Sequence, residues 1–474
     1  MILPTPRPLA RQVASTCRDL VVQPGLPFAQ HLPAAQVYQL VQELGGAYRE
    51  RIYTPAVTLW TFLTQVRDPD QSCQQAVDRL IAHRVAAGRR PCSADTGAYC
   101  RARRRLPEAL LRALTQQFGH GLAESAEATW RWHGRPVQVV DGTGLSRPDT
   151  RANQRAYPPP ATVRPGLGLP LARLVVVFSL DVGAVLDAAL GRFEGKGSGE
   201  VSLFRSLDDV LQAGDVLVGD RIYSNFWDVA RAQARGVDVV MRLHAGRKSP
   251  WFRGRGHSKA NKRLCWRKPP RPEWMTEEEY AAYPEWLRLR AVCVDVRQRG
   301  FRSKRLILVT TLRDPVAYPA PDLAALYRRR WQAELNLRSL KVTLQMDILR
   351  GKSPDIVRKE VWAHLLTYNI VRRLMAEAAR QAQVRPDELS FAGALQAVNA
   401  FLPKLDGARS AEEVTQLGAA LLAVIACHRV GDRPDRVEPR AVKRRPKHYP
   451  RLREPRAQAR QRLKQGATPK GKKR

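Results

Sequence analysis

The feature that most constrains the fold is the order of apolar runs between residues 135 and 243. Five runs are typical of strands, namely RPVQVV, LARLVVVFSL, VGAVLDAAL, DVLVG and VDVVMRL, and two show helical spacing, namely SGEVSLFRSLDDVLQAG and NFWDVARAQARG. A continuous apolar run such as LARLVVVFSL is typical of a buried strand. Only a short turn separates it from the next run, so we expect an antiparallel hairpin. The order β-β-β-α-β-α-β predicts an α/β fold built on a mixed sheet with crossover helices.

The chain on either side of this sheet is organised differently. Before it, apolar residues recur at helix spacing, and after His244 short β-like runs such as WLRLRAVCVDV and KRLILVTTL appear. The end of the chain is basic, with fourteen Lys and Arg and one acidic residue over 443–474, which is typical of a disordered segment that binds phosphates. We therefore expect a helical N-terminal DNA-binding region (1–130), the first part of the core (131–243), a β-rich insertion (244–312), a functional helix with C-terminal helices (313–430) and a basic disordered tail (431–474).

The charge of the chain points to a polyanionic partner. Its 474 residues hold 80 Lys and Arg against 44 Asp and Glu, a formal net charge of +36. Nucleic acid is the commonest such partner, because phosphates attract basic side chains and release counterions. A generally solvated basic surface is the alternative. No apolar run approaches the roughly 18 residues of a membrane span, and the start of the chain lacks an apolar signal core, so we expect a cytoplasmic protein without a membrane partner.

Three acidic residues stand where a metal site would form. Asp141 ends the first strand, Asp220 ends the fourth, and Glu334 lies on a helix after the sheet. Strand ends meet at one edge of a sheet, and carboxylates that approach each other there repel unless cations neutralise them. Two Mg²⁺ ions would do so, and they would activate an attacking oxygen and stabilise a leaving one. For each aspartate alone the alternative is an ordinary turn residue, since Asp-Gly is a common turn.

The helix that carries Glu334 strengthens this interpretation. Tyr327, Arg330, Glu334 and Lys341 are separated by 3, 4 and 7 residues, so in a regular helix they fall on one face. A carboxylate flanked by Arg, Lys and Tyr suits a site that holds a metal ion and grips phosphates beside it. The alternative is an amphipathic helix with incidental ion pairs, of which Arg330–Glu334 would be one.

Two further groups of residues are candidates for DNA contacts. The first is a set of arginines on a helix predicted near residue 95: Arg101, Arg103, Arg104 and Arg105. A solvated charged face is the alternative for this set. The second is a set of tryptophans in or near basic segments that would stack on a displaced base: Trp251, Trp266 and Trp331. For any one tryptophan, burial in a core is the more common outcome.

At these positions the sequence resembles the bacterial insertion-sequence transposases of the insertion sequence 4 family, within the DDE superfamily. The family spacing Y-x2-R-x3-E-x6-K matches Tyr327, Arg330, Glu334 and Lys341, and the segments DGTGLSRPDTRANQRAYP and VLVGDRIYSN resemble its blocks around the two aspartates. The resemblance implies an RNase H-like catalytic core interrupted by a β-rich insertion, with Mg²⁺ as cofactor and Mn²⁺ as a substitute. The metal ligands would be Asp141, Asp220 and Glu334. The phosphates of the transposon end would be bound by Tyr327, Arg330 and Lys341.

Together these inferences predict a DDE transposase that cleaves DNA at transposon ends and joins it to target DNA in cut-and-paste transposition. We expect double-stranded DNA as partner, a homodimer in the DNA complex and association with the nucleoid when DNA is bound. We expect no nucleotide cofactor, because GRFEGKGSGE lacks the spacing of a phosphate-binding loop. The alternatives are a catalytically silent, transposase-derived DNA-binding protein and a nuclease of the same fold that acts on branched DNA.

Overall fold

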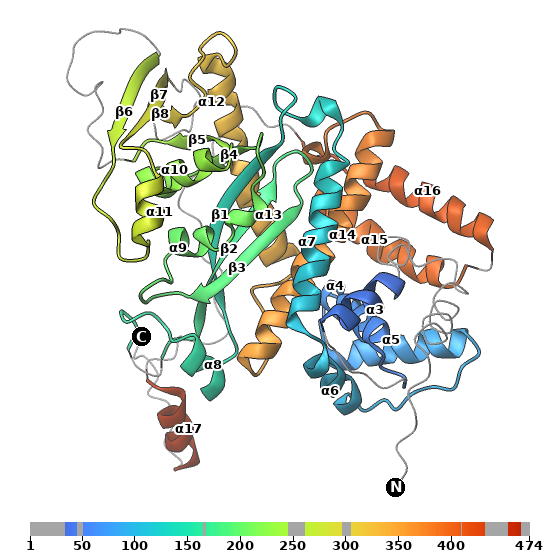
Figure 1. Cartoon of the computed structure of the whole chain (residues 1–474). Coiled ribbons are helices and arrows are strands. Elements are labelled where there is room, and N and C mark those ends of the chain that lie inside the picture. The colour runs from blue at the N-terminus through green and yellow to red at the C-terminus, as the bar shows by residue number, and fades with distance from the viewer. Residues whose placement is uncertain are drawn as a thin grey trace, which may run out of the picture.

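The computed structural model describes residues 34–44, 51–164, 167–244, 261–295, 305–408, 410–431 and 454–465. An eight-stranded sheet in the order β3-β2-β1-β4-β5-β8-β7-β6 forms its centre (Figure 1). The strands are β1 (Val137–Ser146), β2 (Leu171–Ser179), β3 (Val185–Arg192), β4 (Val216–Gly219), β5 (Asp238–Arg242), β6 (Asn261–Arg267), β7 (Trp286–Asp295) and β8 (Arg305–Thr310).

Helices surround this sheet. They are α3 (Ala34–Glu43), α4 (Pro55–Arg67), α5 (Cys73–Ala86), α6 (Gly97–Arg105), α7 (Glu108–Glu124), α8 (Arg151–Ala156), α9 (Glu200–Arg205), α10 (Phe226–Ala234), α11 (Glu277–Ala282), α12 (Ala320–Arg329), α13 (Trp331–Arg338), α14 (Pro354–Gln381), α15 (Phe391–Asp406), α16 (Ala411–Cys427) and α17 (Arg456–Lys464). None of the helices in the described residues is long and apolar enough to cross a membrane.

The first five strands appear in the order that the sequence predicts. β1, β4 and β5 run parallel, with Val139 opposite Val218, while β2 is antiparallel to both β1 and β3. Helices α9 and α10 connect β3 to β4 and β4 to β5. The mixed α/β class is thereby confirmed. The β2–β3 hairpin turns at Gly183, whose positive φ of 73° is a conformation that glycine adopts without strain.

Strands β6, β7 and β8 extend the same sheet beyond β5. β8 pairs antiparallel with β5, β7 with β8, and β6 with β7. The β-strands expected over this part of the chain are present, and they continue the core sheet because Val309 of β8 pairs with Met241 of β5. Two stretches of the expected insertion, 245–260 and 296–304, lie outside the described residues, and Trp251 with them.

Part of the basic tail is described, and disorder of the whole tail stays a prediction. Residues 454–465 are described, and most of them form α17. This helix fits its sequence, because Pro455 precedes a run of Ala, Arg, Gln, Leu and Lys, which are all good helix formers. The rest of the tail beyond residue 431 lies outside the described residues.

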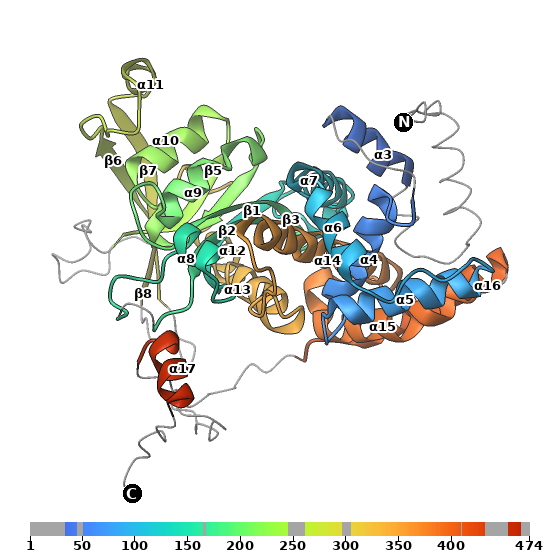
Figure 2. The ribbon, with the colours of Figure 1, turned by 90° about the horizontal axis from the view of Figure 1, so that it is seen from below.

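Side chains that alternate along β1 enter two separate hydrophobic clusters. Val139 belongs to the cluster that contains residues of α7, α12, α13 and α14, and we call this side of the sheet the front face. Val140 belongs to the cluster that contains residues of α9 and α10, on the back face. Figure 2 shows α9 and α10 on one side of the sheet and α12 and α13 on the other. Because side chains alternate along a strand, Asp141 projects from the front face.

The long helix α14 fastens the front face to the rest of the fold. Its Asn369 side chain accepts a hydrogen bond from Val185 N at 2.7 Å and donates to Val185 O at 2.8 Å and to Thr115 O at 3.2 Å, so it joins α14, β3 and α7. Helix α7 approaches β3 at Gly119, where a Cβ atom would lie 2.0 Å from Val185 O. This close approach leaves no space for a methyl group on the helix.

We therefore expect Gly119→Ala to lower the free energy of unfolding by about 1–3 kcal/mol, as overpacking does in a tightly packed core. Gly121, on the same helix, is exposed, and nothing lies within 4 Å of its Cβ position. Gly121→Ala is the matched control and should raise the free energy of unfolding by roughly 0.5–1 kcal/mol. Denaturant unfolding measures both changes, and a Gly119→Ala protein as stable as the control variant would refute the close packing.

Candidate active site

The two predicted aspartates lie just beyond the paired part of two neighbouring parallel strands. Asp220 follows the end of β4, but Asp141 does not end its strand as the sequence predicted, because β1 continues in antiparallel pairing with β2 as far as Ser146. The last residue pair in the register of β1 and β4 is Val139–Val218, and two residues further along each strand stand Asp141 and Asp220. Asp220 keeps an extended backbone, and its Oδ1 accepts a hydrogen bond from Arg221 N at 2.7 Å. Because adjacent strands are about 4.8 Å apart, the two carboxyl groups start from adjacent positions on the front face.

Arg330 connects Asp141 to Glu334. Its Nη2 donates to Glu334 Oε1 at 2.8 Å, and its Nη1 lies 3.9 Å from Asp141 Oδ2. Arg330 stands at the junction where α12 ends and α13 begins. The side chains of Arg330 and Asp141 are only 16% and 17% exposed, so this contact is largely shielded from solvent.

The regular helix face expected from Tyr327 to Lys341 is interrupted. The segment consists of α12, α13 and a π-helical turn over Ser339–Thr343, and this wider turn changes the direction of the side chains that follow. Lys341 nevertheless reaches β1, where its Nζ donates to Thr143 Oγ1 at 3.1 Å and to Gly144 O at 3.2 Å. Arg330 and Lys341 of the predicted signature therefore both contact β1, the strand that carries Asp141.

Burial and neighbouring charges shift the pKa values of this group. Burial raises the pKa of Asp141 to about 6, Glu334 and Glu200 act in the same direction, and Arg330 opposes them. Burial also raises the pKa of Tyr327 to about 12, with a smaller contribution from Asp220. The structure thus brings all three predicted carboxylates within electrostatic reach of Arg330 or Tyr327. Glu200, which the sequence reasoning did not single out, belongs to the same neighbourhood.

The donor atoms suit a hard divalent cation, which prefers carboxylate oxygens. With the side chains in these positions, no three His, Cys, Asp or Glu residues in the described parts of the chain are grouped closely enough to hold a metal ion. Arg330 offers a physical reason for the absence of such a group, because its guanidinium already contacts Asp141 and Glu334 and supplies their positive counter-charge. An ion held by these carboxylates would take over the role of Arg330 as their counter-charge.

The basic helix α6 divides its arginines between surface and interior. Arg101, Arg104 and Arg105 are exposed. Arg103 is only 8% exposed, and it donates to Gln65 Oε1 and to Cys73 Sγ, both at 3.1 Å. Arg103 was expected to contact DNA, and in this position it instead holds α6 against α4 and α5. The buried residues of α6 are Tyr99, Ala102 and Arg103, whose i, i+3, i+4 spacing places them on one helix face, so the sequence held a signal for the buried position of Arg103.

The two described tryptophan candidates also differ in exposure. Trp266 is buried in the back-face cluster, which is the core alternative weighed from the sequence. Trp331 is 58% exposed at the start of α13, immediately after Arg330. Of these two, only Trp331 presents surface on which a base could stack.

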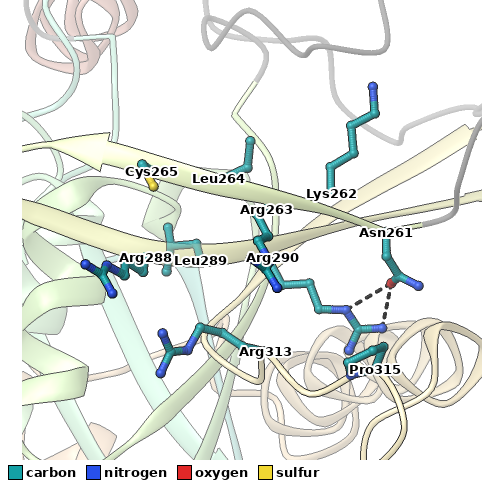
Figure 3. Close-up of a pocket in the computed structure, with 10 residues that line it drawn as sticks. All are labelled: Asn261, Lys262, Arg263, Leu264, Cys265, Arg288, Leu289, Arg290, Arg313 and Pro315. Carbon is teal, nitrogen blue, oxygen red and sulfur yellow. Dashed lines mark hydrogen bonds between the residues drawn. The ribbon is translucent and has the colours of Figure 1, made fainter.

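A basic pocket of about 520 Å³ lies where β6 and β7 meet the segment after β8 (Figure 3). None of the described residues that line it is acidic, and the basic ones among them are Lys262, Arg263, Arg288, Arg290 and Arg313. Arg290 is fixed by Asn261 Oδ1 at 2.6 and 2.9 Å and by Tyr318 O at 2.7 Å. Arg263 lies directly opposite Arg290 in the β6–β7 register, and like charges in such a pair destabilise a sheet. The pocket therefore favours an anion.

Comparison with known proteins adds independent information. A family model described as "Transposase DDE domain" matches residues 132–370. The chain is 27% identical over 417 residues to the transposase InsG for insertion sequence element IS4 of Escherichia coli (strain K12), which spans 85% of this chain and 88% of that protein. It is 39% identical over 61 residues, 13% of this chain and 16% of the other, to the transposase for insertion sequence element IS421 of Escherichia coli. A chain of a piggyBac transposase synaptic complex with hairpin DNA aligns at a TM-score of 0.41 and 10% identity, over 79% of this chain and 73% of that chain.

Arg103 is buried and Arg104 is exposed, so substitutions at these neighbouring arginines of α6 should have different effects. We expect Arg103→Gln to lower the free energy of unfolding by about 1–3 kcal/mol, because it removes buried hydrogen bonds, and to leave the salt dependence of DNA binding unchanged. Arg104→Gln is the matched surface control, with little effect on stability. Denaturant unfolding and binding titrations at several salt concentrations measure both properties. A stable Arg103→Gln protein with weakened DNA binding would show that Arg103 faces DNA after all.

Proposed function

This chain belongs to the transposases with a DDE domain, enzymes that cleave DNA and transfer its strands, and we propose that Asp141, Asp220 and Glu334 are its catalytic carboxylates. The observation that carries the proposal is the contact of one guanidinium, that of Arg330, with both Asp141 and Glu334. Asp220 stands at the neighbouring strand end on the same face. Carboxylates this close together need a positive counter-charge. Arg330 supplies it in this structure, and metal ions would replace it in the active site.

We propose Mg²⁺ as the cofactor, two ions in number, with Mn²⁺ as a substitute, and Asp141, Asp220 and Glu334 would hold them. When bound, such ions activate the attacking oxygen and stabilise the leaving oxygen of a phosphodiester. The proposed reaction is cut-and-paste transposition: water attacks the phosphodiester at the transposon end, and the freed 3′-hydroxyl then attacks target DNA. Both steps are in-line phosphoryl transfers at the same carboxylates.

The neighbouring polar residues would hold the DNA phosphates in place. Arg330 would pass from the carboxylates to a phosphate, which a guanidinium binds through two parallel hydrogen bonds. Lys341 lies beside Thr143, two residues beyond Asp141 on β1, and is placed for a second phosphate. The raised pKa of Tyr327 keeps its hydroxyl protonated, so it remains a hydrogen-bond donor.

The fold is consistent with an RNase H-like core interrupted by an insertion. In this proposal β1 to β5 with α9 and α10 form the core, and residues 244–312 form the β-rich insertion that extends its sheet. The support is positional: one carboxylate lies midway along β1, the next follows β4, and Glu334 comes from a helix later in the chain. Residues 1–130 would form the DNA-binding region, with Arg101, Arg104 and Arg105 as its surface contacts.

The basic pocket would bind the same DNA beyond the reaction centre. Trp266 of β6 and Leu289 of β7 lie on the back face, and Arg263 and Arg290 occupy the alternate positions on the same two strands. The pocket therefore opens on the front face, from which Asp141 also projects. β7 is three strands from β4, or roughly 14 Å along the sheet. A duplex with one phosphate at Asp141 can therefore place others in the pocket. If cleavage passes through a hairpin, Trp331 is our candidate for the side chain on which a displaced base stacks.

We also expect two copies of the chain in the DNA complex.

The catalytic assignment predicts that Asp141→Asn, Asp220→Asn and Glu334→Gln each reduce DNA cleavage by about 10³-fold or more, because each removes a metal ligand without changing the size of the side chain. Affinity for the same DNA should persist. The substrate is a supercoiled plasmid that carries the gene with its native flanking DNA, incubated with the full chain and Mg²⁺.

Glu273→Gln is the matched control for this series, since Glu273 is an exposed carboxylate paired with Lys196 at 2.7 Å, and it should cleave normally. Full cleavage by any one of the three active-site variants would remove that residue from the assignment. A wild-type protein that binds the plasmid but never cuts it in Mg²⁺ or Mn²⁺ would instead favour a silent DNA-binding protein.

The pocket proposal predicts a change in salt dependence. Replacing Arg263, Arg288 and Arg313 together by Gln should lower the slope of log affinity against log salt by about 2–3, because each lost phosphate contact removes nearly one unit. The same three residues replaced by Lys keep the charge and serve as the control. Equal slopes for the Gln and Lys variants would contradict phosphate binding in the pocket.

A further inference from the structure

The two proposed catalytic aspartates are each next to a glycine. Gly142 follows Asp141, and Gly219 precedes Asp220. Because side chains alternate along a strand, a side chain at either glycine would point to the back face, opposite the carboxylates. Neither position has free space there: a Cβ at residue 142 would lie 2.5 Å from Glu200 Cδ, and one at residue 219 would lie 3.3 Å from the Tyr223 side chain.

The groups that fill these two spaces are bonded to each other. Tyr223 donates its hydroxyl hydrogen to Glu200 Oε1 at 2.9 Å. Tyr223 is fully buried, with its ring edge-on to Phe204 at 5.2 Å between centroids. Burial, reinforced by Glu200, raises the pKa of Tyr223, so its hydroxyl remains a donor.

Glu200 is itself held at its other oxygen. Arg173, on the back face of β2, lies 3.5 Å from Glu200 Oε2, and its guanidinium is in turn held by the carbonyl of Phe193 at 3.1 Å. Glu200 is also the first residue of α9, where a negative charge is favourable. A flexible glutamate would otherwise swing away from Gly142, but these contacts fix its carboxyl group against the strand.

A continuous path of contacts therefore joins the two aspartate-bearing segments behind the sheet: Gly142, Glu200, Tyr223 and Gly219. We propose that Glu200 and Tyr223 act as a positioning pair, which we call the Glu200–Tyr223 clamp, that fixes Asp141 relative to Asp220. The proposal rests on the proposed catalytic role of the two aspartates. The clamp stands on the back face, so it acts through the strands and does not touch DNA.

The local structure explains why such a clamp would be needed. β4 has only four residues, and Asp220 stands just beyond its end, where the ladder hydrogen bonds to β1 have stopped. Asp141 and Asp220 would also repel each other when both are ionised. The clamp supplies a connection between the two segments at the level where the strand pairing no longer does.

The test measures the cleavage rate constant at saturating DNA separately from DNA affinity, in the full chain with the plasmid that carries the gene and its flanking DNA. Glu200→Ala should lower the rate constant by about 10²-fold, because a displacement of about 1 Å at a reacting centre has an effect of that size. Its DNA affinity and melting temperature should stay close to those of the wild type. Glu200→Gln keeps the chain length and an oxygen that accepts the Tyr223 bond, and should stay within about threefold of the wild-type rate constant.

Tyr223→Phe removes only the hydroxyl and should lower the rate constant by about tenfold. Tyr368→Phe is the matched control, because Tyr368 is also fully buried and its hydroxyl donates at 2.9 Å, but to Gly183 O. It should retain the wild-type rate constant. Since Glu200→Ala and Tyr223→Phe break the same contact, the double variant should be no slower than Glu200→Ala alone.

The clamp is contradicted if folded Glu200→Ala or Tyr223→Phe cleaves at the wild-type rate, if Glu200→Gln is as slow as Glu200→Ala, or if Tyr368→Phe is as slow as Tyr223→Phe. If Glu200→Ala does not fold, Tyr223→Phe and its control decide the question. Asp141→Asn is measured in the same series. Cleavage by Asp141→Asn would overturn the catalytic assignment, whereas an inactive Asp141→Asn beside fully active clamp variants would overturn the clamp alone.

Discussion

Repulsion between carboxylates at one end of the sheet is the constraint around which the site is arranged. Two parallel strands bring Asp141 and Asp220 to adjacent positions, and the junction of α12 and α13 brings Glu334 over the same edge. Like charges about 4 Å apart near a protein surface repel by roughly 4 kcal/mol, which is more than one hydrogen bond returns. Arg330 relieves part of this repulsion through its contacts with Asp141 and Glu334. Although Arg330 lowers the pKa of Asp141, the effect of burial is larger, and the pKa is raised. We expect a site with these opposing charges to bind other cations, and its arginine to move to a phosphate when DNA is bound.

The sheet separates the chemistry from its support. The front face carries the carboxylates, the phosphate-binding candidates and the basic pocket, while the back face carries α9, α10 and the Glu200–Tyr223 pair. The alternation of side chains along β1 allows this division, because neighbouring residues such as Asp141 and Gly142 point to opposite sides. In the function proposed above, DNA would be bound on one surface while the two aspartate-bearing segments are held from the other. Packing such as that of Gly119 against β3 keeps the front-face helices in register with the strands.

Local sequence patterns predict the parts of this structure that depend on interactions between residues close together in the chain. The strand order, the β2–β3 hairpin and the position of Asp220 after β4 follow from apolar runs and turn residues, whereas β1 runs past Asp141 because it pairs with β2 as far as Ser146. Features that depend on distant partners could not be read in the same way. The hydrogen bonds that hold Arg103 in the interior depend on Gln65 and Cys73 from other helices, and the extension of the core sheet depends on the pairing of β8 with β5. The π-helical turn and the role of Glu200 depend on how side chains from separate segments meet, although the glycines beside both aspartates were a visible signal for the latter.

The most direct test of the central claim, that Asp141, Asp220 and Glu334 together hold divalent ions, is to let the ion itself mark its ligands. Fe²⁺ in place of Mg²⁺, supplied with hydrogen peroxide and ascorbate, reduces the peroxide to hydroxyl radicals that cut the peptide chain close to the bound ion, and mass spectrometry of the fragments locates the cuts. The full chain bound to its DNA should be cut near residues 141, 220 and 334, and excess Mg²⁺ should suppress all three cuts together. Cuts that fall elsewhere, or cuts near these residues that persist unchanged in Asp141→Asn, would contradict the shared metal site.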